Sequence, residues 1–151
     1  MVSVAVASVV VLGFTYINFH NIRISESNVH QLQANLYAME AMEVTKDLAI
    51  SAWDEFDECG SVCHPQLDTN EGKWRLVSGP EEDLGPNGVF TRTMEVGDVY
   101  RDGNNNIVTP SAGGDLDTHT KRVSVTVNWE DAVGEQEVDV ETYVHIYDTT
   151  N

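Results

Sequence analysis

Residues 1–19 have the sequence MVSVAVASVVVLGFTYINF, and this stretch decides the fold that we expect. It contains no Asp, Glu, Lys or Arg, and the first charged side chain of the protein is Arg23. At a helical rise of about 1.5 Å per residue, about 19 apolar residues cross nearly all of the hydrocarbon core of a bilayer. The stretch is therefore a candidate membrane span.

Three interpretations of this stretch are open. A cleavable secretory signal is disfavoured, because no basic segment precedes the apolar run and the small residues Ala5 and Ala7 lie inside it rather than after it. A single-pass anchor and a helix that packs against copies of itself both fit the composition. The residues that follow help to separate these two.

The helical pattern continues beyond Phe19. Apolar residues recur mostly every three or four positions, and no Pro or Gly occurs from Ala34 to Glu58. The recurring residues are Ile22, Val29, Leu32, Leu36, Met39, Val44, Leu48 and Ile50. We therefore predict one helix of about 80 Å from near Met1 to near Phe56, too long for a compact domain. Gly13 is the one position inside it where local melting is expected.

The pattern changes after the helix. Residues 57–72 contain two Cys, a Pro and two Gly and show no periodicity, so we interpret them as a loop. From Lys73 onward apolar residues alternate with polar ones, which predicts strands separated by turn-rich segments. The alternating stretches are Trp74–Leu76, Val89–Val99, Val123–Trp129 and Val138–Ile146.

These elements predict an α+β fold. We expect an antiparallel sheet of about four strands to cover the apolar stripe of the helix over residues 31–56. Residues 1–22 would then form a protruding apolar half-helix and residues 23–56 an amphipathic half-helix. The head, residues 57–151, would form one globular domain with residues 31–56.

The charge balance excludes one class of function. The chain has 25 acidic and 8 basic residues, a formal net charge of −17. A nucleic-acid groove needs clustered Lys and Arg to neutralise phosphates, so none is expected. Two roles for the acidic surface stay open, namely solvation alone and the binding of divalent cations.

Three stretches near the C-terminus carry a resemblance. They are GVFTRTMEVGDVYRDGNNNIV, DLDTHTKRVSVTVNW and VDVETYVHIYD, which begin at residues 88, 115 and 138. Their aromatic-Thr-Arg strand, DVYRD hairpin and V-x-V-x-V-x-W strand resemble the C-terminal half of bacterial prepilin-type proteins. With the long helix ahead of them, the whole chain resembles type IV pilins and the pseudopilins of type II secretion.

The resemblance implies a non-enzymatic structural subunit of an extracellular type IV pilus-like filament. Its partners would be copies of itself in a helical homopolymer, the inner membrane before assembly, and the pilus assembly machinery. The residues expected in the filament core are Val4, Val6, Val9, Val10, Val11, Leu12, Phe14 and Ile17. A main structural subunit is favoured over a minor pilin or pseudopilin, and adhesion, motility, DNA uptake and secretion all stay open.

The chain departs from the family at its start. Such proteins normally begin, after leader cleavage, with a phenylalanine-led segment that carries a glutamate, and MVSVAVASVVVLG matches what usually follows that glutamate. Either several residues precede Met1 in the full protein or its N-terminus differs. The resemblance thus implies the apolar packing in either case, whereas the charge pairing that the family uses depends on a glutamate that this sequence does not contain at its start.

The motif Cys59-Gly-Ser-Val-Cys63-His64 has three interpretations. We favour a small disulfide loop between Cys59 and Cys63, as expected outside the cell. With one residue more than the usual spacer, the motif also resembles a c-type haem attachment. Haem bound in this way, with His64 as an axial ligand, would make the filament an electron carrier. The third interpretation is a metal site or free thiols, and a metal site would need two more ligands nearby.

The turn Asp102-Gly-Asn104-Asn-Asn106 spaces its oxygen-bearing side chains like the start of a calcium loop, and Asp98 lies just before it. It lacks the glycine at the sixth position and the acid at the twelfth, and Asp-Gly-Asn is also a good hairpin turn. Calcium is thus an alternative cofactor, and no cofactor is the primary expectation. No catalytic residues are expected, because the chain has no phosphate-binding loop, no His-Glu-x-x-His pair and no Gly-x-Ser-x-Gly elbow.

Overall fold

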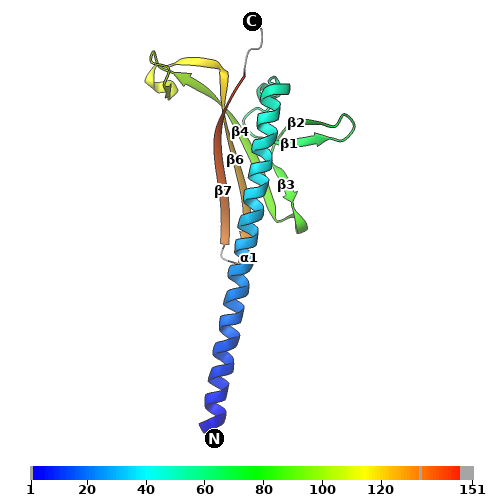
Figure 1. Ribbon diagram of the computed structural model, residues 1–151, viewed down its shortest axis with the longest axis vertical. Coiled ribbons are helices and arrows are strands. Elements are labelled where there is room, and N and C mark those ends of the chain that lie inside the picture. The colour runs from blue at the N-terminus through cyan, green and yellow to red at the C-terminus, as the bar shows by residue number, and fades with distance from the viewer. Residues whose placement is uncertain (1, 133, 147–151) are drawn as a thin grey trace.

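The computed structural model consists of one long helix and one sheet that lies against its C-terminal half (Figure 1). It describes residues 2–132 and 134–146, without the side chains of residues 2–12 and 87. Helix α1 spans Val2–Ser51, 50 residues, or about 75 Å at the usual rise. The short helix α2 follows at Glu55–Glu58. As Figure 1 shows, the N-terminal half of α1 extends beyond the sheet.

Helix α1 differs from the prediction in two details. It continues through Gly13 without melting, because one glycine costs only about 1 kcal/mol and its neighbours on both sides are helical. It ends at Ser51 rather than near Phe56, which instead lies in α2. Phe56 is buried there and packs edge-on against Trp53 at 5.2 Å between ring centroids.

The sheet is antiparallel and has seven strands, with the order β2-β1-β4-β6-β7 and with β3 and β5 paired to β4. The strands are β1 Cys63–Asp68, β2 Lys73–Ser78, β3 Glu81–Leu84, β4 Phe90–Arg101, β5 Ile107–Val108, β6 Asp115–Asp131 and β7 Gly134–His145. Two short 3-10 helices, η1 at Pro86–Gly88 and η2 at Pro110–Ala112, lie between strands.

The predicted α+β fold with a sheet of about four strands is therefore wrong, since the sheet has seven strands and dominates the head. Strands β2, β4, β6 and β7 match the alternating stretches, β3 and β5 are short and lack alternation, and β1 alternates Cys63, Pro65 and Leu67 with polar residues that the prediction left in a loop. Strand β1 occupies the predicted loop despite Pro65. Its ladder with β4 has one residue pair, Cys63 with Met94, so the missing N–H of Pro65 breaks no long ladder there.

The core lies between the sheet and a face of α1 made of small residues. Ala34, Ala38 and Ala41 are buried against the sheet, together with Val44, Thr45 and Leu48 farther along the helix. From β6, alternate residues Val123, Val125, Val127 and Trp129 supply the facing surface. Small side chains on the helix let its backbone approach the sheet closely. The prediction that the sheet covers the larger apolar residues of α1 holds only near the C-terminal end of the helix.

Beyond the core, the second half of β4, β5, η2 and the first part of β6 form an arm that projects away from α1 (Figure 1). We call residues 97–120 the arm. It begins where the β4–β6 pairing shifts register between Asp98 and Val99. Val99 is buried in the arm although it lies outside the main core.

Candidate functional site

The most unusual surface of the protein is the unpaired part of α1. Every described residue from 13 to 26 is exposed, including the predicted filament-core residues Phe14 (69% exposed) and Ile17 (57%). Tyr16, Phe19, Ile22 and Ile24 are exposed as well. The side chains of Val4, Val6, Val9, Val10, Val11 and Leu12 lie outside the described residues. Within the described part of the chain, no helix is both long enough and apolar enough to cross a membrane.

A second apolar stripe continues this surface along the part of α1 that carries the head. Val29, Leu32, Leu36 and Met39 are all at least half exposed, and their spacing of three and four residues places them on one side of the helix. At 100° per residue they lie about opposite to Ala34, Ala38 and Ala41. We call these four residues the outer stripe. The sheet covers one side of the helix and leaves the outer stripe in solvent.

Arg92 ties the head to the helix at the level of the outer stripe. It is 2% exposed on β4, and its Nη1 donates to the carbonyl oxygen of Tyr37 at 2.9 Å and to Glu40 Oε2 at 3.1 Å. Its Nε and Nη2 donate to Glu81 Oε2 at 2.9 and 2.6 Å. Sequence reasoning missed this residue. The available signal was the β4 alternation, which places Arg92 between the inward-facing Phe90 and Met94.

The two cysteines form a disulfide between the end of α2 and the start of β1. Cys59 and Cys63 are fully buried, with Cα atoms 5.2 Å apart. His64 donates from Nδ1 to the carbonyl oxygen of Gly79 at 2.9 Å, a bond that spans the β1–β2 hairpin. Because the disulfide uses both sulfurs, haem attached through thioethers would first require that bond to be broken. The structure thus gives His64 a place in strand β1, where it pairs with Val77 of β2.

Of the four candidate calcium ligands, Asp102, Asn104 and Asn106 lie together in one turn, and Asp98 lies before it on β4. Asp98 Oδ1 accepts a bond from Lys121 Nζ at 3.0 Å. Asp102 accepts three bonds within its own turn, from the backbone of Asn104 and Asn106 and from Asn106 Nδ2. The side-chain bond from Asn106, aided by its backbone bond, lowers the pKa of Asp102. Among the described residues, no group of three or more His, Cys, Asp or Glu is placed to hold a metal ion.

Lys121 joins three elements on the helix side of the sheet. Its Nζ lies 3.0 Å from Asp98 of β4 and 3.2 Å from Asp57 of α2. Burial disfavours its charge, but the hydrogen bonds to both carboxylates outweigh burial and raise the pKa of Lys121. This contact is structural, since it holds α2 beside the point where the arm begins.

The site of greatest interest is therefore a surface rather than a pocket with reactive groups. Comparison of the chain with family models, with curated proteins and with solved structures finds no match. The basis for a functional proposal is therefore the chemistry of the exposed surface of α1.

Proposed function

We propose that this chain is a structural subunit of an extracellular filament of the type IV pilus kind, built by packing of its long helix against the helices of other copies. One observation carries the proposal. Helix α1 exposes large apolar side chains from Phe14 to Met39, and those of the outer stripe lie on the side away from its own sheet. An exposed set of large apolar side chains of this extent marks an interaction site.

The energetics favour burial of this surface. Each large side chain transferred from water into a helix interface contributes about 1.5–3 kcal/mol. Packing of helices side by side would cover the outer stripe and the half-helix that precedes it in one continuous contact. The acidic head, with most of the chain's net charge of −17, would then face outward into water.

The sequence before residue 23 supports a route for assembly. A charge-free apolar half-helix is stable both in a bilayer and inside a bundle of identical helices. The inner membrane would hold the subunit before assembly, and assembly machinery would transfer it to the filament. No catalytic step is needed in this function.

The test compares two carboxylates placed at exposed positions of α1. Leu36→Asp puts a charge in the outer stripe, whereas Gln31→Glu puts one at an exposed position that is not three or four residues from any member of the stripe. Both positions are exposed in the free subunit, so neither variant should unfold it. A charge buried without a partner costs several kcal/mol per subunit. We expect Leu36→Asp to abolish filaments sheared from cells, with subunit levels unchanged, and Gln31→Glu to retain them. Equal filament yields from both variants would contradict the proposal.

A further inference from the structure

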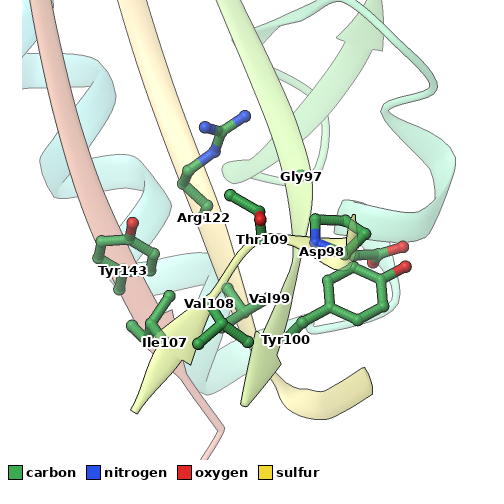
Figure 2. Close-up of a pocket in the computed structure, with 10 residues that line it drawn as sticks. Gly97, Asp98, Val99, Tyr100, Ile107, Val108, Thr109, Arg122 and Tyr143 are labelled. Atoms are coloured by element: carbon green, nitrogen blue, oxygen red, sulfur yellow. The ribbon is translucent and has the colours of Figure 1, made fainter. Parts of the chain in front are cut away.

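The arm encloses a hollow on the face of the sheet that points away from α1. Ile107 and Val108 of β5, which pairs with β4, and the following Thr109 border it on one side (Figure 2). The hollow has a volume of about 470 Å³. Its polar wall includes Arg122 of β6 and Tyr143 of β7. These two residues are cross-strand neighbours, and Arg122 also pairs with Gly97 of β4.

Gly97 positions the guanidinium of Arg122. A Cβ atom at residue 97 would lie 3.4 Å from both Nε and Nη2 of Arg122, so the guanidinium rests over the β4 backbone where a side chain would otherwise stand. Arg122 remains about half exposed. Its planar group is thus held at the rim of the hollow and still offers donors to the outside.

Arg122 has no carboxylate at hydrogen-bond distance among the described residues. Its ion pair is with Glu141 at 3.7 Å, too long for a hydrogen bond. By contrast, Arg75, Arg92 and Arg101 each have a carboxylate oxygen within 3.0 Å. In a chain with 25 acidic residues, this one guanidinium at the hollow has unused capacity for a carboxylate.

Exposed apolar side chains next to Arg122 also line the hollow. Ile107 and Tyr143 are each 45% exposed. Among described residues away from α1, the other exposed large apolar side chains are Leu67 and Leu116, and Leu116 also lies on the arm. Tyr and Arg beside exposed aliphatic groups are typical of the anchoring part of a protein interface.

We infer that this hollow binds a carboxylate-bearing segment of a second copy of the chain, with Arg122 pairing the carboxylate and Ile107 and Tyr143 covering its apolar stem. Local charge complementarity favours a second copy as the occupant: each copy carries 25 Asp and Glu residues, so a neighbour in the filament brings carboxylates to Arg122. This inference rests on the proposed filament, in which neighbouring heads are held at high effective concentration.

Zero-length crosslinking of assembled filaments tests it. In the Arg122→Lys variant the charge is kept, and a carbodiimide can join the new amine to a carboxylate in contact with it. Filaments grown from a mixture of nitrogen-15-labelled and unlabelled subunits distinguish links between copies from links within one copy. The exposed Lys73, on the β2 strand, is an internal control in the same sample.

We expect crosslinked peptide pairs, one labelled and one unlabelled, that join position 122 to an Asp or Glu of a second copy. These pairs should be lost in the double variant Arg122→Lys, Leu36→Asp. Three results would overturn the inference. Position 122 could be linked only to Glu141 of the same copy, or only to another protein. Its links between copies could also be no more frequent than the links between copies formed by Lys73. None of these results contradicts the proposed function, because the filaments still form in each case. Failure of the proposed function is distinct, because the unmutated chain would then form no filaments to crosslink.

Discussion

Arg92 donates two hydrogen bonds to Glu81 Oε2, from Nε at 2.9 Å and from Nη2 at 2.6 Å, and this pair joins strand β4 to strand β3. The same guanidinium reaches α1 through the carbonyl of Tyr37 and the carboxylate of Glu40. One buried cation therefore connects the helix, a central strand and an edge strand. A buried charge is tolerated only when its donors are satisfied, as they are here.

The two carboxylates around Arg92 should contribute unequally to stability. Glu81 accepts two bonds and is mostly shielded, whereas Glu40 accepts one and is about half exposed. Glu81→Gln leaves Arg92 buried with a weaker partner, so we expect the free energy of unfolding to fall by about 2–3 kcal/mol. Glu40→Gln should lower it by less than about 1 kcal/mol. Urea denaturation measures both, and equal losses would show that burial does not set the strength of these bonds.

The position of Arg92 also shows what sequence reasoning could reach. Alternation along β4 was correctly interpreted as a strand, and it places Arg92 on the buried side. Its partners were beyond prediction, because Glu81 belongs to a four-residue strand without apolar alternation and Glu40 lies 52 residues away. Long-range pairing, not local pattern, made β3 a strand.

The helix shows the complementary limit. Its periodicity correctly predicted one continuous helix with a protruding N-terminal half. The same periodicity could not tell which apolar side faces the sheet, because α1 has two. The alanine side of α1, rather than the outer stripe, packs against the sheet, because Ala34 and Ala38 allow the helix to approach β6 and β7 closely. Leu36 and its neighbours were consequently assigned to the wrong partner.

The arm depends on the absence of a side chain at Gly114. A Cβ there would stand 2.5 Å from Val108 Cγ2 and 3.0 Å from the carbonyl oxygen of Arg101. We expect Gly114→Ala to displace β5 and destabilise the protein by about 1–3 kcal/mol through overpacking. Gly103→Ala is the matched control, since nothing lies within 4 Å of its Cβ position. Amide chemical shifts of residues 97–120 report the displacement, and unchanged shifts in the Gly114 variant would rule it out.

Acid should loosen the arm through Asp117. The hydrogen bond from Arg101, only 2.6 Å long, outweighs burial and lowers the pKa of Asp117 from 3.8 to about 2. The folded state therefore holds the ionised form to lower pH than the unfolded chain does. The stability that this adds, at most about 2 kcal/mol, is present above about pH 4 and is lost as the pH falls through about 2.

A comparison of the unmutated chain with Asp117→Asn isolates this contribution to stability. The difference in the free energy of unfolding should be largest near pH 6 and should vanish near pH 2. Urea titrations at a series of pH values measure it, and a carbon-13 titration of the carboxyl group gives the pKa directly. A difference that stays constant over this range would mean that the Arg101 contact does not shift the pKa.

The disulfide should stabilise the fold modestly. Cys59 and Cys63 are only four residues apart, so the bond closes a small loop, and the loop-entropy relation gives a contribution of about 2 kcal/mol. We expect the double variant Cys59→Ala, Cys63→Ala to fold with a free energy of unfolding lower by about this amount. Ala suits both positions because they are fully buried. In the unmutated chain, intact mass should show the loss of two hydrogens and the protein should be colourless. A Soret band together with a covalently added haem mass would show that the two sulfurs hold a haem instead of a disulfide. The proposed function would then be that of an electron carrier.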